Sequence, residues 1–301
     1  MKYIYAQPAI QYFAWQIDIV LASHKKIGTR MDDIHIISAT YDEIDPYFDR
    51  LIRKYPGVLF VFYPDKREYR DYIPSIKQHL AHQHWQNHPE LENEAIVLMD
   101  ADTMMVAPID FSRILNDDVW WMSNTVSYLG YDYIVSKGRR VIEKMCDIAD
   151  IEEGLVRQNQ NNSGGAQYVM KNVPTDYWEE VVGLSHRLYA EMQNTIQPLS
   201  SDPPGYVKLQ IWTSEMWALL WVAWKRGIKT GVAEELNFCW ATDPVDKWSE
   251  VSIFHNAGVV EATDDLFFKG NYINTLPSTN INLKNTRCSS KYYNFLSETL
   301  K

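Results

Sequence analysis

Two acidic residues, Asp100 and Asp102, stand one residue apart directly after a short apolar run at 95–99. A second apolar run at 104–106 follows, and Pro108 ends it. A short apolar run bounded by turn signals is typical of a buried strand. Ligands of open α/β sheets bind outside the carboxyl ends of strands, where paired carboxylates can hold a divalent cation against a phosphate. Because the Asp-x-Asp pattern is common, a solvated acidic turn is the alternative.

Two further residues could take part in chemistry. His255 ends an apolar strand predicted over 251–255. An isolated histidine is usually structural, but this position at a strand end, like that of the acids, favours a third metal ligand. Glu215 lies in the first turn of a very apolar helix predicted over 212–226. Its carboxylate could stabilise the helix dipole, or act as an acid or base whose pKa is raised by burial.

Glycines, tryptophans and cations supply candidate binding residues. Gly164 and Gly165 follow an Asn-rich loop and enter an apolar strand. Adjacent glycines either let a ligand approach the backbone closely or form a flexible turn. The tryptophans cluster at 120–121 and 212–240, where they could form core or a stacking wall. The segment 66–77 mixes cations and aromatics, so one or two of its cations, Lys77 among them, could face a diphosphate, although a solvated surface explains most of them.

The elements that must position these residues alternate along the chain. Strands are predicted at 2–6, 34–39, 58–63 and 95–99. Helices are predicted between them at 11–24, ended by Gly28, at 45–55 and at 72–84, and a further short helix is predicted at 110–115. This alternation predicts an α/β fold with a mainly parallel sheet covered by helices. The acids close the fourth strand. A nucleotide-sized half-domain therefore precedes them.

Composition limits the class of protein. The chain has 301 residues, 46% of them hydrophobic and 23% charged, which is ordinary for a globular protein. A formal net charge of −10 gives no general attraction to nucleic acid, although a local basic groove remains compatible with it. The three cysteines are widely spaced and form no zinc pattern, which suits a reducing compartment. No signal peptide or membrane-length apolar run is visible, so we expect a soluble cytoplasmic protein without a membrane partner.

The motifs together resemble the GT-A family of glycosyltransferases. The Asp100-Ala-Asp102 sequence is similar to the metal-binding motif of that family, and the sequence from His255 to Gly258, followed by Lys269, is similar to its late metal and phosphate motif. The resemblance implies one domain of the GT-A fold, with a nucleotide-binding half at 1–110, a sugar and acceptor half at 111–270, and a tail at 271–301. It also implies a Mn²⁺ or Mg²⁺ cofactor and a nucleotide-diphosphate sugar donor such as a UDP-sugar. It implies that Asp100, Asp102 and His255 bind the metal. The implied nucleotide-sugar contacts are Gln7, Lys77, Gly258 and Lys269.

A narrower similarity is to the hydroxyproline arabinosyltransferase and peptidyl-serine galactosyltransferase group. It rests on Gln11 and Trp15, the segment 72–77, and the spacing of Trp212, Glu215 and Met216. The chain departs from that group in having no visible secretory signal or disulfide set. A short relative of this kind resembles phage enzymes that attach arabinose to 5-hydroxymethylcytosine in DNA, in the cytoplasm of the host. The resemblance implies catalytic roles for Asp100 and Glu215, and sugar or acceptor contacts from Gly164, Gly165, Gln167, Trp212 and Trp240.

Three other interpretations remain open. The acceptor hydroxyl could belong to a protein or a small molecule. A haloacid-dehalogenase-type phosphatase has an Asp-x-Asp after an apolar strand, with the first acid as nucleophile and the second as general acid. Against it, Met104 stands at the fifth motif position, and almost a hundred residues precede the motif. The third alternative is a non-catalytic protein that binds nucleotides or carbohydrates.

Overall fold

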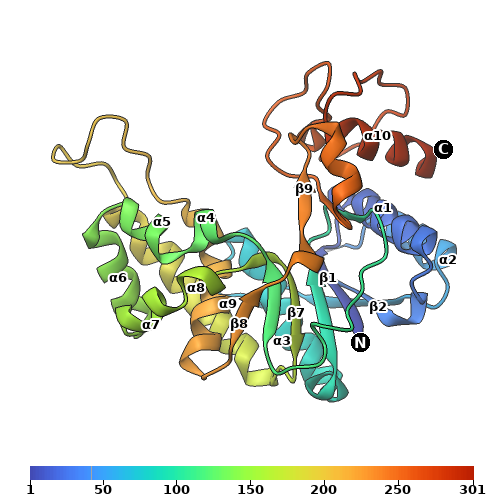
Figure 1. Ribbon diagram of the computed structural model, residues 1–301. Helices are drawn as coiled ribbons and strands as arrows, with labels where there is room; N and C mark the ends of the chain where they lie inside the picture. Colours follow the sequence, from blue (N-terminus) through green and yellow to red (C-terminus); the bar gives the residue numbers. More distant parts are fainter. Residues whose placement is uncertain (42) are drawn as a thin grey trace. The chain divides into compact units, whose positions relative to one another are not determined.

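The structure, a computed structural model, describes residues 1–41 and 43–301 (Figure 1). It confirms an α/β fold whose central sheet has seven mainly parallel strands flanked by helices. The chain forms two compact units. Unit 1 contains Met1–Pro64, Leu98–Arg113 and Glu234–Lys301, and unit 2 contains Asp65–Val97 and Ile114–Ala233. Strand β4 (Ala95–Met99) passes from unit 2 into unit 1. The predicted division of ligand-binding roles at residues 110 and 270 stays a prediction.

Unit 1 contains the first half of the predicted alternation. Its elements are β1 (Lys2–Pro8), α1 (Gln11–Ile27), β2 (Ile34–Thr40), α2 (Tyr47–Lys54), β3 (Leu59–Pro64), β5 (Thr103–Met105), β9 (Phe238–Trp240), β10 (Ile253–His255) and α10 (Cys288–Thr299). Strand β2 lies between β1 and β3 and pairs with both in parallel, with Tyr3 opposite Ile34 and His35 opposite Leu59. Helices α1 and α10 lie side by side (Figure 1).

Local sequence explains these elements. All but the first residue of β1 and all but the last of β2 are buried, as expected for strands of a parallel sheet that is covered by helices. Helix α1 ends at Gly28, whose φ of +81° is a left-handed conformation that glycine adopts without strain. The predicted helix end at Gly28 is confirmed.

A small second sheet in unit 1 has the order β5-β10-β9. Strand β10 is central, antiparallel to β5 and parallel to β9. It lies on an aromatic core shared with α1 and α10. The buried residues of this core are Trp15, Ile19, Met104, Cys239, Ala241, Phe254, Phe267, Cys288, Tyr292, Tyr293 and Leu296. The small sheet is therefore held by the N-terminal and C-terminal parts of unit 1.

Unit 2 combines three strands with most of the helices. Its elements are α3 (Ile76–Asn87), β6 (Trp120–Ser123), α4 (Val126–Leu129), α5 (Tyr131–Ser136), α6 (Arg139–Ala149), α7 (Glu153–Gln158), β7 (Gly165–Lys171), α8 (Thr175–Thr195), α9 (Ser214–Lys225) and β8 (Thr230–Val232). Strand β6 pairs antiparallel with β7 and parallel with β8. Helix α8 packs against α3, α6 and α9. Every residue of α9 from Ser214 to Trp224 is buried, which explains why its sequence is apolar on all sides.

One predicted element is wrong. The segment 110–115 was expected to form a short helix but contains only a turn. The Asp110 carboxylate accepts a hydrogen bond from the backbone N–H of Ser112 at 2.9 Å, and this local bond gives the chain an alternative to helix.

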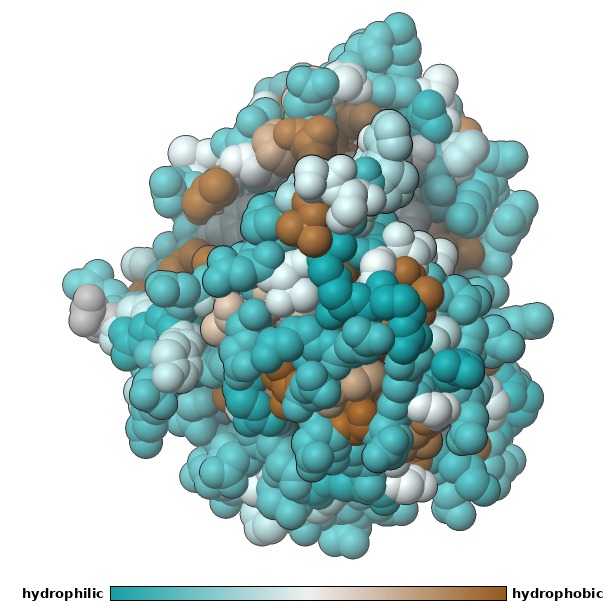
Figure 2. All heavy atoms as spheres, turned by 90° about the vertical axis from the view of Figure 1, so that its left-hand side faces the viewer, coloured by the Kyte–Doolittle hydropathy of each residue, from teal (hydrophilic) through white to brown (hydrophobic). Residues whose placement is uncertain are grey.

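On the face shown in Figure 2, hydrophilic residues predominate and hydrophobic residues form small separate groups. Among the described residues, no helix is long and apolar enough to cross a membrane.

Candidate functional site

The structure brings Asp100, Asp102 and His255 together in unit 1. One ligand atom from each lies within 4.8 Å of the others. The Nε2 atom of His255 is 3.2 Å from Oδ1 of Asp102 and 3.8 Å from Oδ2 of Asp100. The histidine is buried and both acids are half-buried. The three residues predicted to bind a metal therefore form a compact cluster, although the chain separates His255 from the acids by about 150 residues.

Backbone pairing between β5 and β10 brings the cluster together. The two acids lie in the turn between β4 and β5, and the antiparallel register places His255 opposite Thr103. The backbone N–H of Asn256 donates to the carbonyl of Asp102 at 2.9 Å. The Thr103 hydroxyl donates to the carbonyl of Asp100 at 2.7 Å, which closes the turn. Sequence reasoning missed Thr103 and Asn256, because nothing local indicates this strand pairing.

Aromatic rings fix the orientation of the histidine. The indole of Trp240 stacks on the His255 imidazole, with ring centroids 5.1 Å apart and planes 29° apart. The ring of Phe238 is also in contact, at 5.8 Å. Both residues belong to β9, which pairs with β10. The observed contact of Trp240 is thus with a proposed metal ligand, and its predicted contact with a sugar or acceptor stays a prediction.

Lys269 is the fourth member of the cluster. Its ammonium donates a hydrogen bond to Oδ2 of Asp102. The two side chains are 22% and 15% exposed, so solvent screens the pair only partly. Burial alone would raise the pKa of Asp102, but the charges of Lys269 and His255 hold it well below its usual range. Burial likewise disfavours the charged form of Lys269, but Asp102 outweighs it and raises the pKa of the ammonium. Both groups are charged at neutral pH.

The donor set fits a divalent cation. Two carboxylates and one imidazole can supply three oxygen and nitrogen ligands, fewer than the six that Mg²⁺ or Mn²⁺ takes, which leaves positions for water and phosphate oxygens. Carboxylate oxygens suit both Mg²⁺ and Mn²⁺, and an imidazole ligand favours Mn²⁺ of the two. The chemistry of the cluster therefore agrees with the predicted cofactor. The identity of the ion stays a prediction.

Two predicted nucleotide-sugar residues also lie in unit 1. Gln7 is buried near the end of β1, where its Nε2 donates to the Ser38 hydroxyl at 2.8 Å. Its Oε1 has no hydrogen-bond partner among the described residues. Gly258 has φ of +83°, and a Cβ there would meet nothing closer than 3.8 Å. The backbone conformation thus explains why glycine stands at 258. The predicted contact of Gly258 with the nucleotide sugar stays a prediction.

Glu215, the predicted acid or base, is held within unit 2. The Tyr72 hydroxyl donates to its Oε2 at 2.6 Å and accepts from its backbone N–H at 2.9 Å. The ammonium of Lys77 is 3.3 Å from Oε1. Two residues predicted for different roles, Glu215 and Lys77, therefore form an ion pair with each other. Tyr72 was missed as a partner of Glu215, because no sequence signal joins residues 143 positions apart.

The glycine pair is explained by packing. A Cβ at Gly164 would lie 2.5 Å from Cβ of Met122, and a Cβ at Gly165 would lie 2.5 Å from Cε of Met216. Both distances are too short for real contacts, so these glycines let β7 approach its own neighbours. The packing interpretation of the pair is favoured over the predicted close approach of a ligand, which stays untested.

The remaining predicted residues of unit 2 differ in exposure. Gln167 is fully buried in β7, where its Oε1 accepts from the Ser123 hydroxyl at 2.6 Å. Trp212, just before α9, is 51% exposed, and its ring contacts Tyr72 edge-on at 6.0 Å. Of these two, Trp212 is therefore the side chain that a ligand could reach directly.

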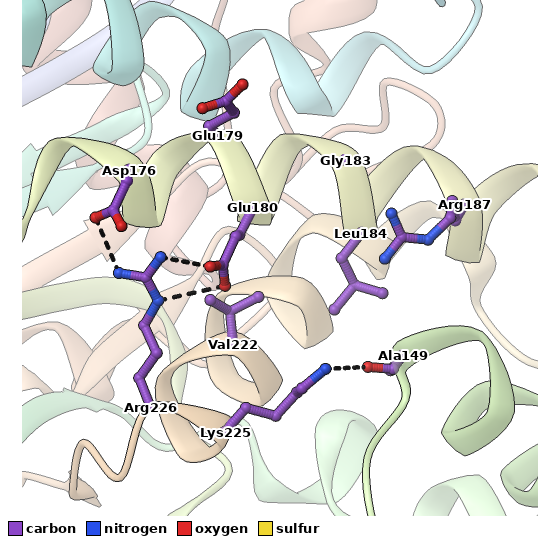
Figure 3. Close-up of a pocket in the computed structure, with 10 residues that line it drawn as sticks. All are labelled: Ala149, Asp176, Glu179, Glu180, Gly183, Leu184, Arg187, Val222, Lys225 and Arg226. Atoms are coloured by element: carbon purple, nitrogen blue, oxygen red, sulfur yellow. Dashed lines mark hydrogen bonds and ion pairs between the residues drawn. The ribbon is translucent and has the colours of Figure 1, made fainter.

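A separate cavity of about 560 Å³ lies between α8 and α9 in unit 2 (Figure 3). The Arg226 guanidinium there is paired with Asp176 at 3.0 Å and Glu180 at 2.6 Å. Lys225 donates to the carbonyl of Ala149 at 2.8 Å. None of the predicted site residues lines this cavity. Because its acids and carbonyls hold two of its cations, we assign it no ligand.

No protein-family model and no curated protein matches the sequence. Solved structures of similar fold include the galactosyltransferase LgtC in complex with donor and acceptor sugar analogues, which covers 86% of this chain and 87% of its own. Another is the apo form of mouse xyloside xylosyltransferase 1, which covers 84% of this chain and 96% of its own. Each has 10% sequence identity and a TM-score of 0.44. At these values the function has to be inferred from the residues of this chain.

Proposed function

We propose that this protein is a metal-dependent glycosyltransferase that uses a nucleotide-diphosphate sugar. The observation that carries the proposal is the cluster of Asp100, Asp102 and His255 with the Lys269 ammonium beside it. A divalent cation and a lysine together suit a diphosphate, whose several negative charges need more than one counter-charge. The cluster follows strand β4, as expected for a ligand site of an α/β sheet.

Each residue of the cluster has a distinct role in this proposal. Asp100, Asp102 and His255 would hold the cation, and Trp240 keeps the imidazole in position. When bound, the cation supplies positive charge that stabilises the leaving nucleotide diphosphate. The Lys269 ammonium supplies a second positive charge to the same leaving diphosphate. The bond between the anomeric carbon and the phosphate oxygen breaks, and its electron pair leaves with the diphosphate.

The acceptor hydroxyl must lose a proton as its oxygen bonds to the anomeric carbon. Glu215 is the proposed base, and Gly164, Gly165, Gln167 and Trp212 are the proposed sugar or acceptor residues. We infer a UDP-sugar as donor, arabinose as the transferred sugar and 5-hydroxymethylcytosine in phage DNA as acceptor, on the resemblance described above. Such a base would flip out of the duplex, and an exposed indole such as that of Trp212 could stack on it. A cytoplasmic location accompanies this acceptor.

Donor hydrolysis tests the core of the proposal. The purified protein is incubated with MnCl₂ and a panel of nucleotide-diphosphate sugars, and the release of nucleoside diphosphate is measured. We expect slow release that depends on Mn²⁺ and is lost in Asp102→Ala. The matched control is Asp264→Ala, because Asp264 also pairs with a lysine of unit 1 but is 65% exposed. Equal loss in both variants, or full activity of Asp102→Ala, would refute the assigned role.

The same assay separates the other functions. No donor turnover together with hydrolysis of an aryl phosphate would favour the phosphatase. Binding of the nucleotide without turnover of any donor would favour a non-catalytic protein. For the acceptor, hydroxymethylated and unmodified DNA are compared. Transfer to hydroxymethylated DNA alone is expected, whereas no transfer to either would leave a protein or small-molecule hydroxyl as the acceptor.

A further inference from the structure

Both oxygens of Asp102 already have partners within the protein. Oδ1 lies 3.2 Å from Nε2 of His255, and Oδ2 accepts a hydrogen bond from the Lys269 ammonium. A divalent cation binds through carboxylate oxygens, so it needs at least one of these positions. The ammonium of Lys269 is therefore bonded to an atom that the proposed metal centre would use as a ligand.

We propose that Lys269 is an internal counter-ion that competes with the divalent cation for Asp102 and is released from it by the diphosphate of the donor. This inference rests on the proposed function. It predicts that the cation binds weakly to the protein alone and tightly when a nucleoside diphosphate is present. The lysine thereby couples cation binding to donor binding, so that an incomplete site does not retain the metal.

The charges of the cluster support this coupling. His255 can ligate a cation only as the neutral imidazole, so the charged groups that a cation meets are the carboxylates of Asp100 and Asp102, one of which Lys269 compensates. A divalent cation added to this set would produce a net positive charge in a half-buried place and would meet the ammonium at short range, which is unfavourable. A diphosphate removes this repulsion because it offers anionic oxygens to the cation and to the lysine at the same time.

The backbone around Lys269 is held in place by contacts of neighbouring residues. Movement of the ammonium from Asp102 to the diphosphate therefore has to come from the side chain. Phe267 is 2% exposed and stacks on Tyr272 with ring centroids 5.4 Å apart. The backbone N–H of Phe267 donates to the Ser289 hydroxyl at 2.8 Å, and the carbonyl of Tyr272 accepts from the Trp15 indole at 3.2 Å. Lysine has four rotatable side-chain bonds, so its ammonium can move while these contacts stay in place.

The test measures Mn²⁺ binding itself, without catalysis. The affinity of the purified protein for MnCl₂ is determined by calorimetry or by the electron paramagnetic resonance of free Mn²⁺, with and without UDP. The variants are Lys269→Met, which removes the charge, and Lys269→Arg, which keeps it. Lys284→Met is the matched control, because Lys284 pairs with Asp264 on the surface of the same unit and is 68% exposed. Lys269→Gln replaces the methionine variant if that variant does not fold.

We expect Lys269→Met to bind Mn²⁺ about tenfold more tightly than the wild type when UDP is absent, which is a typical coupling between two ligands. With UDP present, the same variant should bind Mn²⁺ no more tightly than the wild type, and it should bind UDP more weakly. Lys269→Arg and Lys284→Met should retain the weak binding of the wild type.

Two results would overturn the inference in different ways. Unchanged or weaker Mn²⁺ binding by Lys269→Met without UDP, with Asp102→Ala abolishing binding, would remove the competition but keep the metal centre. No Mn²⁺ binding by wild type or by Lys269→Met, even with UDP, would refute the metal centre and with it the proposed function.

Discussion

His24 should make the stability of unit 1 depend on pH. This residue of α1 is fully buried, and its Nε2 is 2.7 Å from the Tyr5 hydroxyl. Its Nδ1 is 3.0 Å from the Thr29 hydroxyl, and the Tyr3 ring contacts it edge-on at 4.7 Å. Among the described residues, no acidic group forms a bond with this imidazole, and burial lowers its pKa to about 3. The neutral imidazole is therefore the form that the folded protein accepts.

The size of the effect follows from linkage between protonation and unfolding. Histidine in an unfolded chain has a pKa of about 6.5. Below that pH the unfolded chain binds a proton that the native His24 does not, so acid favours unfolding. The stabilisation is complete above about pH 6.5 and falls by about 1.4 kcal/mol per pH unit until the pH nears 3. Between pH 7 and pH 5 the loss is about 2 kcal/mol.

Urea unfolding at pH 7, 6 and 5 measures this loss, with tryptophan fluorescence as the signal. The control is His24→Gln, whose amide cannot titrate. Other histidines contribute slopes of their own, and burial lowers the pKa of His186 in unit 2 to about 4. The quantity compared is therefore the difference between wild type and His24→Gln. A difference that stays constant from pH 7 to pH 5 would refute the reasoning, whatever the absolute stability of the variant.

Three further predictions concern single contacts, each measured as the free energy of unfolding in urea. Gly164→Ala should destabilise the protein by about 1–3 kcal/mol, because the added methyl meets fixed neighbours. Gly154→Ala, where a Cβ has nothing within 4 Å, should be neutral or slightly stabilising, and equal costs for both would contradict the packing argument. Tyr72→Phe removes a buried hydroxyl bonded to a carboxylate and should cost about 1.5–3 kcal/mol; no loss would mean that water replaces it. In a double-mutant cycle of Asp102→Asn and Lys269→Met, we expect a coupling of about 1–3 kcal/mol, whereas additive costs would show that the ion pair is not formed.

Local patterns predicted the elements of the fold well. The strand before Asp100 and the helix end at Gly28 depend on nearby residues, and both are confirmed. His255 was placed beside the acids because all three follow apolar strands. The contacts of the cluster could not be predicted in the same way. The bond between Lys269 and Asp102 joins residues 167 positions apart, and it depends on how β5, β10 and the C-terminal segment pack.

Packing also provides a structural explanation for residues at which the sequence left a functional interpretation open. The glycines at 164 and 165 suggested a ligand, but the structure shows close contact with Met122 and Met216. Glu215 suggested a residue facing a pocket, and it is found bonded to Tyr72 and Lys77. A small residue or a buried carboxylate has the same sequence signature whether its neighbour is a ligand or the protein itself. Only the three-dimensional contacts distinguish the two.

The pairing of β5 with β10 has a consequence for how the chain folds during its synthesis. A ribosome makes β5, then the long segment 114–233 of unit 2, and only afterwards β9 and β10. Strand β5 therefore stays unpaired until β10 has emerged with most of the chain. The segment 114–233 can begin to fold before that. Contacts between such distant segments form slowly and leave unpaired strand edges exposed to aggregation. We expect the proposed metal centre to be the last part of unit 1 to assemble, and truncation before residue 251 to leave β5 without its partner.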